Sequence, residues 1–158
     1  MINLKMQLKE FFLTRLCVVW HSPPKPMQVV SEFGFGYDVA RHKTEPRHFR
    51  LTFTMHAAPK EKTPLAGYEI DCQIVGLFTF VEGVDEAEMQ QLIRINGCTI
   101  LYGILRGQIA GVTGSFVDGK FNLPTVMMHE VVQNIEADKA AARAKKNSAT
   151  TATQHSKA

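Results

Sequence analysis

The sequence predicts an α+β fold, in which a four-stranded antiparallel sheet is followed by two or three helices that pack on one face of it. Apolar and polar residues alternate through much of residues 2–80, which is typical of strands with one face towards solvent. After Gly83 the apolar residues instead recur every three or four positions, which is typical of one side of a helix. Strands first and helices second is the order expected when helices gather on one face of an antiparallel sheet.

Four segments carry the alternating pattern of strands. In the first, the alternation begins at Leu4 and slips after Lys9, which predicts a β-bulge, and Pro23 ends the strand. The second contains Gly34 and Gly36, so one of its faces is bare enough for backbone or ligand to approach closely. Apolar residues at every second position place the last three strands at 33–39, 49–55 and 68–80.

The helical half begins with a capping signal. Asp85 is the expected N-cap of the first helix, because Glu86 and Glu88 follow it in the first turn, where carboxylates suit the helix dipole. The pair Asn96-Gly97 is expected to end this helix. A final short helix is predicted at about 126–144.

A second helix is predicted to begin near Thr99 and to carry a stripe of glycines. Gly103, Gly107 and Gly111 recur at intervals of four residues, and we call them the glycine stripe. Each glycine costs roughly 1 kcal/mol against alanine in a helix interior, so we expect the stripe to pack closely against another backbone.

Length and charge predict one domain at 1–135 and a basic, largely disordered tail at 136–158. A chain of 158 residues can bury one sizeable core, and 45% hydrophobic with 21% charged residues is an ordinary globular composition. The formal charge of +3 comes from the tail, which holds five of the 18 basic residues and two of the 15 acidic ones. The neutral body gives no support for binding nucleic acid.

The cysteine pattern predicts a cytoplasmic protein. Three cysteines lie far apart, no CxxC occurs, and no secretory leader precedes the body, all of which suit a reducing compartment. No apolar stretch reaches the roughly 18 residues that span a bilayer, so we expect no membrane insertion.

No catalytic residue, cofactor or metal is predicted. The glycines at 34 and 36 lack the third glycine of a dinucleotide-binding loop, and no GxxxxGK[ST] phosphate-binding loop is present. Cys17 and His21 lie four residues apart on one strand face and would need further ligands, for which Cys72 and His56 are the candidates. Ordinary packing explains these residues more simply than a metal site.

The load of phenylalanine and methionine is high for one small domain. Ten Phe and seven Met are present, and many of the Phe lie in the strand half. One interpretation is a phenylalanine-rich core. The other is an apolar groove for irregular, unfolded segments, because flexible Met and flat Phe side chains re-pack around many shapes.

Four stretches between residues 33 and 131 resemble the SecB export chaperones and SecB-like proteins. Segment 69–80 resembles the family's acidic, alternating strand with its glycine-containing end, and segment 96–103 resembles the start of its long helix. Gly114-Ser-Phe116 and Phe121-Asn-Leu-Pro124 follow in the family's order and spacing. The resemblance implies a four-stranded antiparallel sheet with two helices, assembled as a dimer of dimers.

The resemblance also implies an activity: ATP-independent holding of unfolded polypeptides in long apolar grooves. Phe33 and Phe35 fall where the family has groove-lining residues. The predicted polypeptide-binding groove consists of Phe33, Phe35, Tyr37, Phe78, Phe80, Phe116 and Phe121.

Two further surfaces are implied by the resemblance. In classical members an acidic outer sheet face docks the translocation ATPase SecA, and Glu69 and Asp71 fall on that face. The resemblance also implies assembly as a homotetramer. Its interface would contain apolar strand residues and the glycine stripe: Ile70, Cys72, Ile74, Gly103, Gly107 and Gly111.

Three departures from the family pattern favour alternatives to SecA docking. Arg15 and Val19 stand where acidic residues are expected, Gly103 replaces the helix-initiating proline, and the tail is basic. These suit a SecB-like chaperone dedicated to one partner, such as an antitoxin. A different class, a small-ligand-binding or enzymatic α+β oligomer, would need Asp71 or a histidine in an apolar cleft.

Overall fold

The computed structural model describes residues 4–154 of the chain, and its side chains as far as residue 145. The chain forms two compact units, Met1–Thr125 and Val126–Ala158. The first unit contains a sheet and the helices that cover it, and the second contains a single helix within its described residues.

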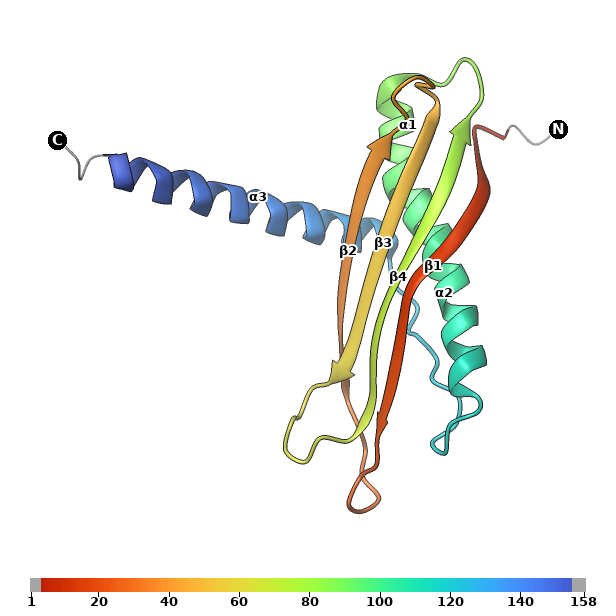
Figure 1. The fold of residues 1–158 in the computed structure, drawn as a ribbon, viewed down its shortest axis with the longest axis vertical. Helices are drawn as coiled ribbons and strands as arrows, with labels where there is room; N and C mark the ends of the chain where they lie inside the picture. Colours follow the sequence, from red (N-terminus) through yellow and green to blue (C-terminus); the bar gives the residue numbers. More distant parts are fainter. Residues whose placement is uncertain (1–3, 155–158) are drawn as a thin grey trace. The chain divides into compact units, whose positions relative to one another are not determined.

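The sheet has four antiparallel strands, which confirms the predicted α+β fold (Figure 1). The strands lie in the order β1-β4-β3-β2, so β1 and β2 form the two edges. Their bounds are β1 Met6–His21, β2 Ser31–Arg41, β3 His48–Pro59 and β4 Gly67–Phe80.

Two register shifts in β1 confirm the predicted bulge and add a second one. They lie between Leu8 and Glu10 and between Leu13 and Arg15. Each shift inserts one extra residue, which flips the side chains that follow to the other face. The apolar residues Leu8 and Leu13 therefore share a face with Phe78 and Ile74 although the alternation is broken.

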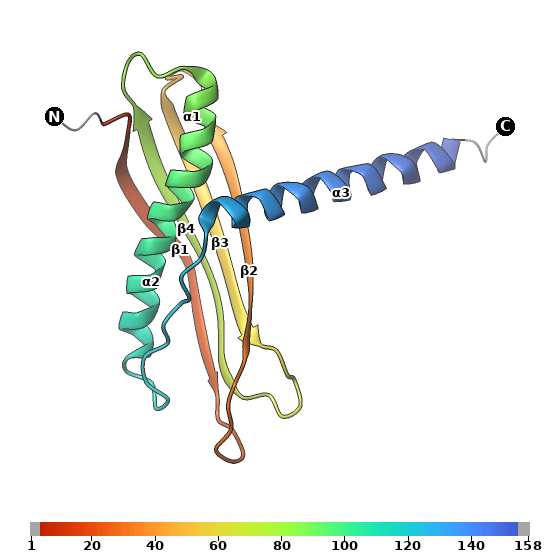
Figure 2. The ribbon, with the colours of Figure 1, turned by 180° about the vertical axis from the view of Figure 1, so that it is seen from behind.

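All the helical segments of the first unit cover one face of the sheet (Figure 2). They are α1 Glu86–Leu92, the π-helical turn η1 Ile93–Gly97 and α2 Cys98–Thr113. The side chain of Asp85 accepts a hydrogen bond from the backbone N–H of Glu88 at 2.8 Å, which confirms the predicted N-cap. We call the covered side of the sheet the helix face and the other side the outer face.

The core lies between the helix face and α2. Every second residue of β4 from Tyr68 onward is buried, as the period of a strand requires. Side chains with no exposed surface come from β3, β4, η1 and α2: Leu51, Phe53, Ile70, Cys72, Ile74, Ile93, Leu101, Leu105 and Ile109.

The prediction that Asn96-Gly97 ends the first helix is wrong. Gly97 has helical dihedral angles, and the chain passes through η1 directly into α2. A Cβ atom added at Gly97 would lie 2.8 Å from Cδ2 of Leu51 and 3.4 Å from Cδ1 of Ile93. The glycine therefore brings the helical layer close to β3 instead of stopping a helix.

The second unit contains α3, Met128–Gln154. The sequence predicts a helix ending near residue 144 and a largely disordered tail, whereas the described backbone is helical to Gln154. Alanine and lysine are common in this stretch and favour a helix. The predicted domain boundary at residue 135 falls inside α3 and stays a prediction. Residues 155–158 of the predicted tail lie outside the described residues.

Candidate functional site

Aromatic side chains from five segments form two sets of ring contacts along the helix face, one containing Phe35 and the other Phe33, and together we call them the aromatic strip. Two come from β2, one each from β3, β4 and α2, and two from the segment that follows α2. The strip consists of Phe33, Phe35, Phe53, Tyr68, Tyr102, Phe116 and Phe121.

One end of the strip is built on α2. The ring of Phe35 lies 5.8 Å from that of Tyr102, nearly edge-on, and 6.2 Å from that of Phe53. Such aromatic pairs contribute about 0.5–1.5 kcal/mol each beyond their buried area. The hydroxyl of Tyr102 donates to the carbonyl oxygen of Pro124 at 2.6 Å. Burial raises the pKa of Tyr102, although Arg106 lowers it, so this hydroxyl stays a donor at neutral pH.

The other end of the strip is built on the segment after α2. The ring of Phe121 lies 6.4 Å from that of Phe33 and 5.4 Å from that of Tyr68, and Phe116 lies 5.7 Å from Tyr68. The Tyr68 hydroxyl donates to the carbonyl oxygen of Gly119. Burial and the charge of Asp118 raise the pKa of Tyr68, which keeps the phenol protonated.

Buried Thr113 fixes the segment after α2 in place. Its hydroxyl donates to the carbonyl oxygen of Ile109 at 2.7 Å and accepts from the backbone N–H of Phe121 at 2.8 Å. Gly119 turns the chain with φ of 76°, a left-handed conformation that favours glycine. Phe116 and Phe121 are therefore held against the sheet by a turn with fixed hydrogen bonds.

The strip has a buried floor and a partly exposed upper layer. Phe53, Tyr68 and Tyr102 are buried. Phe33, Phe35, Phe116 and Phe121 each keep part of their surface exposed, and all four were predicted to line the groove. Apolar surface of this kind is available for other apolar side chains.

Three predicted groove residues lie in the core instead. Phe78 is 1% exposed, and its ring fills the space left by Gly76 and Gly97. Phe80 is 5% exposed and packs edge-on against Phe49 at 5.4 Å. Tyr37 is also buried. The prediction failed for them because alternation along a strand shows which face a side chain is on, and not whether another segment covers it.

A hollow of about 280 Å³ adjoins the strip at Tyr68 and Phe121. Its other apolar lining residues include Trp20, Met27 and Val29. The indole Nε1 of Trp20 is buried and has no hydrogen-bond partner within the described residues. Sequence reasoning missed Trp20, although it is the single tryptophan of the chain and lies in register with Tyr68.

The strip lies beside an open sheet edge. Within the described residues β2 pairs with β3 alone, so one row of its backbone N–H and C=O groups faces outward. Phe33 and Phe35 lie on this edge strand. A polypeptide bound there would meet aromatic side chains and free backbone groups together.

On the outer face, side chains of β1 contact both predicted partner-binding carboxylates. Arg15 contacts Asp71 through two nitrogens, at 2.8 and 3.1 Å, and His21 Nε2 lies 3.1 Å from Glu69 Oε2. Arg15 on the neighbouring strand thus occupies Asp71, and His21 on the same strand lies beside Glu69. These pairs are exposed, so each stabilises the fold only weakly.

The structure does not bring together the candidate metal ligands Cys17, His21, Cys72 and His56. Cys17 is exposed and in register with Asp71 on the outer face, whereas Cys72 is buried on the helix face. Burial raises the pKa of the Cys72 thiol to about 11, and the thiol donates a hydrogen bond to the Met55 carbonyl oxygen at 3.4 Å. Among the side chains that the structure describes, no group of three His, Cys, Asp or Glu is placed to hold a metal.

The residues predicted for assembly fall into two sets. Ile70, Cys72 and Ile74 have no exposed surface within one chain, so they hold α2 on the sheet and have none to offer a second copy. The glycine stripe is open, because a Cβ added at any of its three members would meet nothing within 4 Å. The close contact expected for the stripe is thus absent within the described part of one chain.

No helix within residues 4–154 combines the length and the apolar character that crossing a bilayer requires. A scan of protein-family models found no match for this chain, and a search of curated proteins found no relative. The architecture itself defines the class: a four-stranded antiparallel sheet with helices on one face.

Comparison with solved structures gives a more particular similarity. The SecB-like chaperone Rv1957 of Mycobacterium tuberculosis, solved in complex with a ChAD peptide from the HigA1 antitoxin, is similar with a TM-score of 0.62 and 19% identity. The match covers 77% of this chain and 91% of that one. A protein of unknown function from Streptococcus agalactiae is similar at 10% identity with a TM-score of 0.44, covering 77% and 98%, too weakly to carry an argument. This chain has a SecB-like fold, and the fold is what similarity at this level shows.

Proposed function

We propose that this chain is a non-enzymatic, ATP-independent chaperone of the SecB-like class, which holds unfolded polypeptide segments on the aromatic strip. The observation that carries the proposal is the partly exposed row of Phe33 and Phe35 on an open edge strand, facing Phe121 and Tyr102. The SecB-like fold supports it at the level of architecture.

The strip suits weak, repeated binding of exposed apolar side chains. A client segment that buries about 1,000 Å² of apolar area gains roughly 25 kcal/mol before the costs of association. Most of this gain is lost in ordering the client chain, so several sites must act together to give useful affinity. By binding the unfolded state selectively, the protein would lower the concentration of chain that can aggregate.

Assembly as a dimer of dimers would supply several strips. The open glycine stripe on α2 supports this proposal, because it allows a second backbone to approach where a larger side chain would prevent it. We propose a cytoplasmic location on the ground that all three cysteines are free thiols.

A chaperone dedicated to one partner is the second candidate. The similar SecB-like chaperone was solved with an antitoxin peptide, which favours a partner of that kind. SecA docking on Glu69 and Asp71 receives no support from the outer face, because side chains of β1 contact both carboxylates.

The experiment that tests the proposal follows the light scattering of an unrelated denatured enzyme, such as citrate synthase, as it is diluted into buffer without nucleotide. We expect this chain to suppress aggregation at about stoichiometric amounts. An unchanged rise in scattering would contradict the general chaperone. Suppression restricted to an antitoxin segment would instead favour the dedicated one.

A further inference from the structure

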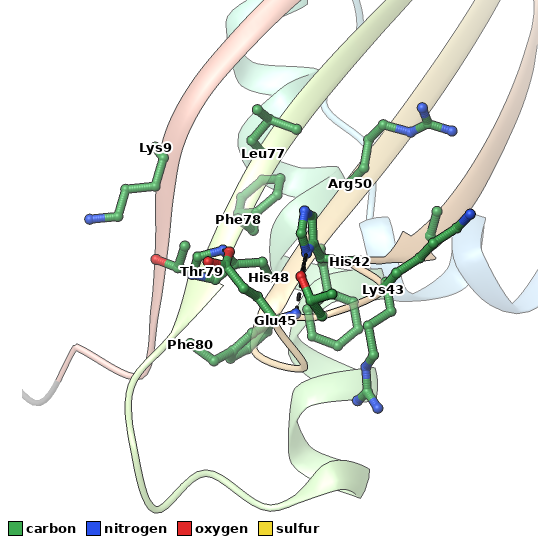
Figure 3. A pocket seen from close by; sticks show the side chains of 14 residues that line it. Lys9, His42, Lys43, Glu45, His48, Arg50, Leu77, Phe78, Thr79 and Phe80 are labelled. Atoms are coloured by element: carbon green, nitrogen blue, oxygen red, sulfur yellow. Dashed lines mark hydrogen bonds and ion pairs between the residues drawn. The ribbon is translucent and has the colours of Figure 1, made fainter.

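An open hollow of about 1050 Å³ lies on the outer face, where the hairpin between β2 and β3 meets β4 (Figure 3). Ala40, Arg50 and Leu77 are in register across β2, β3 and β4, and they form one row of its floor. His48 and Thr79, also in register, form the next row. The aromatic strip lies on the opposite face of the sheet, so the hollow is a separate surface.

Cations surround the hollow. Lys9 extends from β1 on one side, and Arg50 and Lys43 extend on the other (Figure 3). All three are exposed, and within the described residues none of them has an ion-pair partner. Nζ of Lys9 donates to Oε1 of Gln7 at 2.7 Å, a neutral partner that leaves the charge uncompensated.

The anions at the hollow are fewer and partly engaged. The carboxylate in its lining belongs to Glu45, which contacts Nδ1 of His48 and is outnumbered by the three cations. Glu10 on β1 lies in register with Leu77 on β4, so it is beside the hollow but does not line it. Arg41 also lines the hollow, but its guanidinium pairs with Glu86 and so adds no free charge. The free charge of the lining is therefore positive.

We propose that this hollow binds an acidic, amphipathic segment of a partner polypeptide. Carboxylates of the segment would contact Lys9, Lys43 and Arg50, and its apolar side chains would lie on Ala40 and Leu77. The hollow on the outer face thus favours an acidic partner, whereas an acidic docking face would favour a basic one. This inference does not depend on the function of the aromatic strip.

The chemistry of the hollow favours a polypeptide over a nucleic acid. A nucleic-acid site typically neutralises about 6–10 phosphates along an extended surface. Three free cations beside the aliphatic side chains of Ala40 and Leu77 offer less charge, and these two side chains have no counterpart to contact in a phosphodiester backbone. Carboxylates and aliphatic side chains that alternate along a peptide match both parts of the surface.

Fluorescence anisotropy with a labelled twelve-residue peptide of alternating Glu and Leu tests this proposal, at about 0.1 M salt, where surface charges are partly screened. We expect Lys43→Glu with Arg50→Glu to weaken binding by about tenfold or more, because two attractive contacts become repulsive. The matched control is Lys25→Glu with Lys60→Glu, which makes the same charge change at exposed residues outside the hollow and should alter binding less than about twofold.

Three outcomes would overturn the proposal. The first is equal loss of binding in the Lys43–Arg50 variant and in its control. The second is equal or tighter binding of a Lys-Leu peptide or of a twelve-nucleotide oligothymidine to the unaltered protein. The third is loss of Glu-Leu peptide binding in Phe33→Asp, since the peptide would then occupy the aromatic strip. A negative result for peptide binding in the hollow does not change the expected result of the aggregation assay. The two proposals can therefore be refuted independently.

Discussion

The ring of Phe33 on β2 lies 6.4 Å from the ring of Phe121 in the segment after α2, at an interplanar angle of 34°. An edge strand and a turn that are far apart in the sequence thus form the two sides of the aromatic strip. Phe33 keeps part of its surface exposed and lies opposite the small Ala57 in the register of the sheet.

Phe33→Asp is expected to abolish most suppression of aggregation while the fold is retained. A charge at this partly exposed edge repels apolar clients but stays in contact with water, so its cost to folding is modest. Phe35 is unsuitable for the same test, because its ring packs on Phe53 and Tyr102. The measurement is light scattering of a denatured client, with circular dichroism to check the fold.

Phe12→Asp is the matched control. Phe12 is 45% exposed and lies on edge strand β1, in register with Val75 on the outer face. We expect it to protect the client as well as the unaltered chain does. Full protection by Phe33→Asp would remove the strip as the binding site.

Thr113→Val should destabilise the chain by about 1–3 kcal/mol, because it leaves the partly buried N–H of Phe121 without its acceptor. Urea unfolding measures this change in the free energy of unfolding. Thr113→Ser keeps the hydroxyl and should recover most of the loss. Thr99→Val serves as the control: the exposed Thr99 hydroxyl also donates four residues back, to Ile95, but within the described residues it accepts from no other segment. If both valine variants cost the same, the hydrogen bond to Phe121 does not fix the turn.

The strands and the cap of α1 were predictable because their signals are local. Alternation along β3 and β4 and the side chain of Asp85 depend on residues within a few positions. The faces of the sheet followed from the same period. Whether a residue such as Phe78 is covered or open depends on where α2 crosses the sheet, and no local pattern specifies that crossing.

The contacts that define the strip were harder to predict for the same reason. Tyr102 and Tyr68 contact Phe35 and Phe121 only after distant segments have packed, so no local pattern predicts these contacts beyond the aromatic character of the residues. Gly97 shows a related limit. Asn-Gly is a common helix end, but here the absent side chain admits Leu51 from β3.

Alkaline pH should weaken the fold through Cys72. Burial raises the pKa of its thiol from the ordinary value of 9.0 to about 11. Below pH 9 both the folded and the unfolded chain keep this proton. Between pH 9 and 11 the unfolded chain releases it while the folded chain does not, so the free energy of unfolding falls by about 2–3 kcal/mol.

Urea unfolding in reductant at pH 8.5 and pH 10.5 measures this loss, and Cys72→Val isolates it. The valine variant should lose less stability over this interval than the unaltered chain, because it lacks the Cys72 thiol. Some loss should remain, because other groups such as Tyr68 titrate in both proteins. Cys17→Val, at an exposed thiol, should behave like the unaltered chain. Equal losses in all three proteins would show that Cys72 does not carry the effect.

The glycine stripe predicts how assembly responds to a single side chain. Gly103, Gly107 and Gly111 leave open space on α2 within one chain, which is a costly arrangement for a helix unless a second copy fills it. If two copies pack there, Gly107→Leu will separate them, and the molar mass from light scattering should fall from about four times 17.7 kDa to a smaller multiple. Gln108→Leu adds a comparable apolar side chain at the next exposed position and should leave the mass unchanged. A Gly107→Leu protein with the mass of the unaltered assembly would exclude the stripe from the interface, and a monomeric unaltered chain would exclude the assembly altogether.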